Sequence, residues 1–146
     1  MILKKNKNIT NIKQKLNSWN KIYSNTEKQY TYLTPKFFIE EKIICAYNGL
    51  SGSALDIKLY CFYGDPKIIL IKFNNKLNFY SIDFEIPVLM DHIINLAKKL
   101  SNQFEFVRMD FYIGIDGIYF SEFTFTPKSG QQRFSNETEI EYGKYW

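Results

Sequence analysis

The residues that could carry chemistry alternate along two strands of a predicted β-hairpin near the C-terminal end of the chain. Arg108 and Asp110 are two residues apart on the first strand, and Glu122 lies on the second. Residues 115–117, Ile-Asp-Gly, suit a three-residue hairpin loop in which the glycine takes the left-handed position. This loop predicts that Asp110 lies directly opposite Glu122 and that Arg108 lies opposite Thr124.

Two carboxylates that face each other across a hairpin repel. At about 5 Å and an effective dielectric of about 20, the repulsion is roughly 3 kcal/mol. A divalent cation held by oxygen ligands would offset this repulsion. Alternatively, the face is simply solvated, and water and Arg108 soften the repulsion without a metal ion. The spacing alone leaves both interpretations open.

The opposite face of this hairpin is apolar and is expected to join the core. Its members are Val107, Met109, Phe111, Ile113, Tyr119, Phe123 and Phe125. On the polar face, Tyr112 is expected opposite Phe120. The hairpin therefore predicts one buried surface and one surface available for chemistry.

The chain as a whole predicts an α+β fold with a largely antiparallel sheet and packed helices. Helices are expected over 9–24 and 87–100, strands over 36–44, 57–63, 67–73 and 77–82, and a loop over 49–53. The second helix is expected to pack through Leu89, Ile93, Leu96, Ala97 and Leu100. The polar tail after residue 130 predicts irregular structure or a short helix.

The segments FVRMDFY and IDGIYFSEFTFTPKSG resemble the end of an ATP-grasp domain, most closely the TupA-like (teichuronopeptide biosynthesis) ATP-grasp family. In that family an Arg-x-Asp-Phe strand precedes a strand with an acidic residue and then a Thr-Phe-x-Pro-x-Ser-Gly run. The resemblance implies that Asp110 and Glu122 hold Mg²⁺ on the phosphates of ATP and that Arg108 is an electrostatic clamp. Thr124 stands where the wider superfamily usually has asparagine, and its hydroxyl is the candidate ligand at the second metal position.

A second resemblance lies upstream. Residues 35–43, PKFFIEEKI, are similar to the family's hinge strand, which passes the adenine base. The resemblance implies that Glu40 and Glu41 lie beside the base. Asp56 and Lys58 resemble the family's Asp-x-Lys motif, and Asp56 is implied for the ribose hydroxyls. From the residues alone, these charges suit an edge strand equally well.

The resemblance spans residues 12–136 and implies the C-terminal half of such a protein. ATP-grasp domains bind nucleotide between two subdomains, and the first supplies a lysine and a Gly-rich loop over the phosphates. Only some 35 residues precede the hinge-like strand, and they contain no glycine. We therefore expect residues 1–146 to form a single, partial domain that needs a missing N-terminal half or a partner subunit.

Composition sets further limits. With 146 residues and 45% hydrophobic content, the chain is expected to fold around a real core. Cys45 and Cys61 are read as small buried residues in a reducing compartment. No signal peptide and no apolar run of about 20 residues is present, so we expect a cytoplasmic protein without a membrane span. The only histidine, His92, is expected on the surface.

Three functions follow. The first is an ATP-grasp catalytic subdomain that uses ATP and Mg²⁺ to activate a carboxylate as an acyl phosphate for attack by an amine. The product would be a cell-surface polymer. The second is a non-catalytic remnant or partner subunit that keeps the fold. The third is a nucleic-acid or interaction module that uses the seven lysines among the first 28 residues, although a solvated helix face explains them better.

Overall fold

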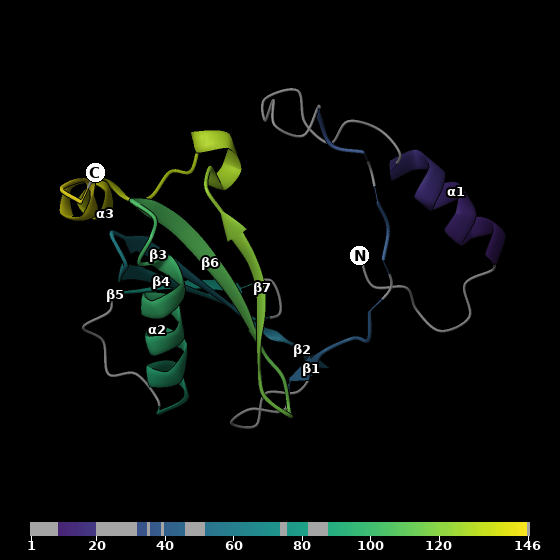
Figure 1. Ribbon diagram of the computed structural model, residues 1–146, viewed down its shortest axis with the longest axis horizontal. Coiled ribbons are helices and arrows are strands. Elements are labelled where there is room, and N and C mark those ends of the chain that lie inside the picture. The colour runs from purple at the N-terminus through teal and green to yellow at the C-terminus, as the bar shows by residue number, and fades with distance from the viewer. Residues whose placement is uncertain are drawn as a thin grey trace. The chain divides into compact units, whose positions relative to one another are not determined.

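The computed structural model describes residues 9–19, 32–34, 36–38, 40–45, 52–73, 76–81 and 88–145. Contacts divide the chain into two compact units, Met1–Lys42 and Ile43–Trp146, and each is described here by itself. The first unit contains helix α1, Ile9–Trp19 (Figure 1). Its middle is amphipathic, because Ile12 and Leu16 are half-buried while the residues between them are exposed. Residues 20–24 of the predicted helix lie outside the described part of the chain.

The second unit is built on a five-stranded sheet in the order β5-β4-β3-β6-β7, and every pairing in it is antiparallel. Its strands are β3 (Leu55–Phe62), β4 (Asp65–Phe73), β5 (Lys76–Ser81), β6 (Phe106–Ile113) and β7 (Ile118–Thr124). A separate pair is formed by β1 (Ile44–Cys45) and β2 (Gly52–Ser53). The helices are α2 (Val88–Ser101) and α3 (Asn136–Gly143), with a short 3₁₀ turn over Pro127–Gly130. The predicted α+β class and antiparallel sheet are confirmed.

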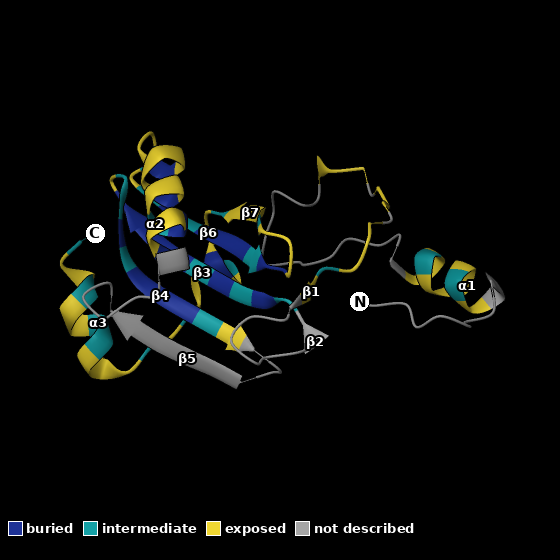
Figure 2. Ribbon diagram, turned by 90° about the horizontal axis from the view of Figure 1, so that it is seen from below, coloured by how far each residue is buried: buried dark blue, intermediate teal, exposed yellow. Residues whose placement is uncertain are grey.

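The two faces of the large sheet are covered differently (Figure 2). Helix α2 packs on one face, where alternate residues of the central strands form the main core with it. These core residues include Ile57, Leu59, Val107, Met109, Phe111, Met90, Ile93 and Ala97. The other face carries a smaller aromatic cluster at the end near α3, formed by Tyr60, Phe62, Ile68 and Leu70 with Phe106, Phe134, Tyr142 and Tyr145. The rest of that face is left for polar side chains.

The packing face of α2 differs from the prediction. Ile93 and Ala97 are fully buried as expected, but Leu96 and Leu100 are 41% and 39% exposed. Met90 is buried in their place, because the helix contacts the sheet along a narrow stripe spaced three and four residues apart. The side chain of Leu89 lies outside the described residues.

The strand predicted over 36–44 is largely wrong. Residues 36–38 and 40–43 are irregular, and only Ile44 and Cys45 pair, with Gly52 and Ser53 in the predicted loop. A strand exists only where a neighbouring backbone accepts its hydrogen bonds, and local β-propensity cannot supply that neighbour. The other strands match the prediction to within two residues at their described ends.

The hairpin has the predicted register at its chemically important end. Arg108 pairs with Thr124 and Asp110 with Glu122. Beyond these pairs the register shifts by one residue, so that the expected facing of Tyr112 and Phe120 is wrong. Phe120 instead pairs with Phe111, and their rings make an edge contact at 5.6 Å. The aromatic contact and the bulge that permits it explain the difference.

The same shift changes the hairpin loop. Ile113 pairs with Ile118, so the loop contains four residues, 114–117, and not three. It is closed by a hydrogen bond from the Gly114 N–H to the Gly117 carbonyl, at 2.9 Å. Gly117 has a φ of +155° and not the left-handed helical value that the three-residue loop requires.

Among the described residues, no helix is both long and apolar enough to cross a membrane.

The observed face of α2 gives a stability test. Ile93→Ala removes a fully buried side chain, and we expect the free energy of unfolding to fall by about 2–5 kcal/mol. Leu96→Ala removes a side chain that is 41% exposed, and we expect a loss below about 1 kcal/mol. Urea unfolding of the two variants measures both values. Equal losses would contradict the observed orientation of the helix.

Candidate functional site

Six of the eight predicted site residues converge on the sheet face opposite α2. Strand residues two apart point to the same face, and the antiparallel register brings Lys58 of β3 opposite Asp110 of β6. Strand β7 continues the same face on the other side of β6. The charged cluster consists of Asp56, Lys58, Arg108, Asp110, Glu122 and Thr124. It lies beside the aromatic cluster near α3.

Asp110 is the centre of this charged cluster. Its side chain is only 3% exposed, yet both of its oxygens have cationic partners. Oδ1 accepts a hydrogen bond from Arg108 Nε at 2.7 Å, and Oδ2 accepts one from Arg108 Nη2 at 2.9 Å. Oδ2 also accepts one from Lys58 Nζ at 2.6 Å. The bidentate guanidinium and the ammonium together compensate the burial of this carboxylate.

Both cations also have second partners. Lys58 Nζ donates to Asp56 Oδ1 at 2.9 Å. Arg108 Nη2 donates to the Thr124 hydroxyl at 3.0 Å and reaches Glu122 Oε1 at 3.3 Å. The network therefore contains three carboxylates and two cationic side chains, with a formal net charge of −1.

The predicted repulsion between Asp110 and Glu122 is thus offset by Arg108, which contacts both carboxylates. The face is not simply solvated, however. Glu122 is 57% exposed, whereas Asp110 is almost fully buried. Protein cations, more than water, therefore neutralise the inner carboxylate.

The two cations are held in their charged forms. Burial by itself would lower the pKa of Lys58, but its hydrogen bonds and its attraction to Asp110 and Asp56 outweigh burial and raise the pKa above 10.5. Burial likewise opposes the charge on Arg108, but the contacts with Asp110 outweigh burial and raise its pKa. Both side chains are therefore positively charged at neutral pH.

Tyr60 is a site neighbour that sequence reasoning missed. It pairs with Arg108 across β3 and β6 and is 3% exposed. The Phe134 ring meets its ring edge-on at 5.5 Å. Burial raises the pKa of the Tyr60 hydroxyl, and the positive charge of Arg108 partly opposes this effect. The available signal was its position two residues after Lys58, on the same strand face.

The oxygen atoms of the charged cluster can be compared with the ligands that a metal ion requires. Among the residues that the structure describes, no three or more His, Cys, Asp or Glu side chains are grouped so that they could hold a metal ion. Mg²⁺ commonly uses only one or two carboxylates and takes its other ligands from phosphate and water. Asp110 and Glu122, opposed on neighbouring strands with the Thr124 hydroxyl nearby, fit that second kind of site.

The other predictions concern residues that are not members of this cluster. Glu40 and Glu41 belong to the first compact unit, where they are exposed on irregular backbone, and their role beside a base stays a prediction. His92 is exposed on α2, as expected. Cys61 is fully buried, and burial raises the pKa of its thiol to about 11, which makes it unreactive at neutral pH. The side chain of Cys45 lies outside the description.

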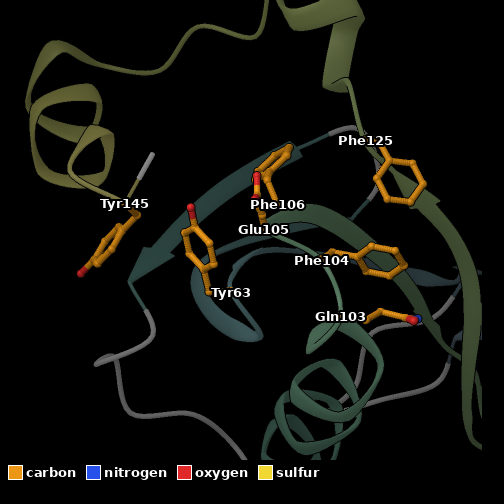
Figure 3. A pocket seen from close by; sticks show the side chains of 7 residues that line it. All are labelled: Tyr63, Gln103, Phe104, Glu105, Phe106, Phe125 and Tyr145. Atoms are coloured by element: carbon orange, nitrogen blue, oxygen red, sulfur yellow. The ribbon is translucent and has the colours of Figure 1, made fainter.

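A hollow of about 440 Å³ lies at the end of the sheet where β6 begins (Figure 3). Tyr63 and Tyr145 stand on one side of it, and Phe104 and Phe125 on the other. Gln103, Glu105 and Phe106 complete the lining. None of the predicted site residues lines this hollow.

The charged cluster predicts a large stability effect at Arg108. Arg108→Met would leave the buried Asp110 with one cationic partner, and we expect the free energy of unfolding to fall by about 3–5 kcal/mol. Arg133→Met is the matched control, because Arg133 is 86% exposed and lies 3.8 Å from Glu139. We expect that change to cost less than about 1 kcal/mol. If denaturant unfolding shows equal losses of unfolding free energy for the two variants, the importance of the cluster is contradicted.

Lys58 predicts a pH dependence. Its pKa in the folded protein lies above the unfolded value of 10.5, so its contribution is complete below that pH and declines as pH rises towards the folded pKa. We expect the difference in unfolding free energy between wild type and Lys58→Met to stay constant from about pH 8 to 10 and to shrink as the pH rises above 10.5. Urea unfolding across this range tests the prediction. A difference that grows above pH 10.5 would have the wrong sign.

Comparison with known proteins adds the family. The model of the TupA-like ATP-grasp family matches residues 1–88 and 75–146, which together cover the chain. The comparisons with curated proteins and with solved structures gave no match. The residues on which the sequence resemblance to this family rests, Arg108, Asp110 and Glu122, are central members of the charged cluster. The chain belongs to the TupA-like ATP-grasp family.

Proposed function

We propose that this chain is the Mg²⁺- and ATP-binding domain of an enzyme that joins a carboxylate to an amine. In ATP-grasp chemistry, ATP converts the carboxylate into an acyl phosphate, which the amine then attacks. The product would be a cell-surface polysaccharide or teichuronopeptide. Family membership supports this proposal, and one observation in the structure carries it.

That observation is the close placement of opposite charges on one sheet face. Asp110 and Glu122 face each other, while Arg108 contacts both carboxylates and Lys58 contacts Asp110. A phosphate carrying Mg²⁺ needs both kinds of group, because carboxylates bind the metal and cationic side chains bind the phosphate oxygens. A surface with only one sign of charge would bind either the metal ion or the phosphate, but not both.

The roles can be assigned residue by residue. Asp110 and Glu122 would hold Mg²⁺, with the Thr124 hydroxyl as a weaker oxygen ligand. Arg108 would bind the transferred phosphoryl group and stabilise its developing charge. Bound Mg²⁺ would neutralise phosphate charge. Lys58 would bind phosphate oxygens as well.

The nucleoside end of the site is assigned to three carboxylates. Asp56 is proposed for the ribose hydroxyls, although it also holds the Lys58 ammonium at 2.9 Å. Glu40 and Glu41 are proposed beside the base. A Gly-rich loop and lysine over the phosphates would come from a further polypeptide segment or a partner subunit, in the cytoplasm. Removing one preorganised donor can cost about 10²–10³ in rate, so turnover depends on that addition.

A second function has its own support. Both cations of the cluster are paired with carboxylates inside the protein. Such a network can hold β3, β6 and β7 together without a ligand. A non-catalytic remnant or partner subunit that retains the fold is therefore the alternative.

Calorimetric titration with MgATP separates the two functions. We expect the wild-type chain to bind, and we expect Asp110→Asn and Glu122→Gln each to weaken binding by at least about tenfold, which corresponds to about 1.4 kcal/mol. Glu141→Gln is the charge-matched control, because Glu141 is exposed on α3, and it should bind as wild type does. Circular dichroism confirms that each variant is folded. Absence of MgATP binding by the wild-type chain would favour the structural alternative.

A further inference from the structure

We propose that Lys58 and Arg108 act as internal counter-cations for Asp110 and move to phosphate when Mg²⁺ binds, so that the metal ion binds only together with phosphate. The identity of the ligand rests on the proposed function. The role of the two cations rests on their contacts in the structure.

The first argument is that the two oxygens of Asp110 already have cationic partners. Arg108 contacts both oxygens at 2.7 and 2.9 Å, and Lys58 contacts Oδ2 at 2.6 Å. The carboxylate is 3% exposed, so little water screens these charges. A divalent cation that bound either oxygen would lie next to a guanidinium or an ammonium. Mutual repulsion therefore disfavours a metal ion that arrives alone.

The second argument is that each cation has another partner in place. Lys58 also donates to Asp56 at 2.9 Å, and Arg108 also donates to Thr124 at 3.0 Å. Each side chain can therefore leave Asp110 without losing all of its hydrogen-bond partners. Neither cation becomes an unpaired buried charge when it leaves Asp110, and this lowers the barrier to its movement towards phosphate.

The third argument concerns charge balance. Phosphate oxygens are strong acceptors for both the arginine fork and the lysine ammonium, so an incoming phosphate can draw them from Asp110. Mg²⁺ then replaces two single positive charges with one double positive charge. The carboxylate keeps the same total compensation before and after the exchange. Metal binding and phosphate binding thus favour each other.

Lys58→Met provides the direct test, with Mn²⁺ as a probe for Mg²⁺. Electron paramagnetic resonance measures the free Mn²⁺ signal in the absence of nucleotide. We expect weak Mn²⁺ binding by wild type and at least about tenfold tighter binding by Lys58→Met, because one competing cation is gone. Lys67→Met is the matched control, since it removes a lysine from another ion pair, with Asp65, and should leave Mn²⁺ binding unchanged.

The double variant Lys58→Met/Asp110→Asn shows whether Asp110 is responsible, and it should lose the gain in Mn²⁺ affinity. Unchanged or weaker Mn²⁺ binding by Lys58→Met would overturn the inference. If Lys58→Met does not fold, the wild-type chain supplies the test through calorimetry. Metal-free ATP should bind measurably while Mn²⁺ alone should bind only weakly, and tight binding of Mn²⁺ alone would overturn the proposal.

These outcomes are separable from the proposed function. A wild-type chain that binds no MgATP, together with an Asp110-dependent gain of Mn²⁺ affinity in Lys58→Met, would reject the nucleotide site and support the counter-cation role. Normal MgATP binding without a gain of Mn²⁺ affinity in Lys58→Met would support the nucleotide site and reject the counter-cation role.

Discussion

The burial of one carboxylate constrains the whole site. Asp110 lies on β6, an interior strand of the sheet, with 3% of its side chain exposed. An ionised carboxylate in such a position is unstable unless charged hydrogen-bond donors surround it. Arg108 comes from the same strand, whereas Lys58 comes from β3, which must pair with β6 in one register to reach it. Compensation of the Asp110 charge therefore depends on the register between β3 and β6, and the ion pair with Lys58 in turn stabilises that register.

The main apolar core and the charged cluster lie on opposite faces of the sheet. Helix α2 covers one face with an apolar core, and aromatic side chains near α3 cover one end of the other face. Between that aromatic cluster and the ends of the strands, charged side chains of β3, β6 and β7 lie next to one another. The fold thus supplies rigid, neighbouring strands as a platform, on which side-chain positions are well determined.

The same interactions that stabilise this platform limit its chemistry. A network whose cations are already paired holds the strands together, but it must rearrange before its carboxylates can ligate metal. Under the proposed function, phosphate would be the agent of that rearrangement. Stability and ligand binding then depend on the same few side chains, as is common where structure and function compete.

Much of the hairpin was predictable from sequence, because its pairing is local. Alternation and an assumed three-residue loop placed Asp110 opposite Glu122 and Arg108 opposite Thr124. The loop has four residues, and these two pairs form as predicted because the bulge compensates for the extra loop residue. They did not reveal the bulge that moves Phe120 onto Phe111, since that shift depends on aromatic packing. Lys58 is 52 residues from Asp110, and only the pairing of β3 with β6 brings them to 2.6 Å. The described hinge-like residues, 36–38 and 40–43, show the converse, because local β-propensity forms no strand without a partner. Residue types and short-range spacing thus determined which groups are available for chemistry, whereas tertiary pairing decided that internal cations neutralise the buried carboxylate.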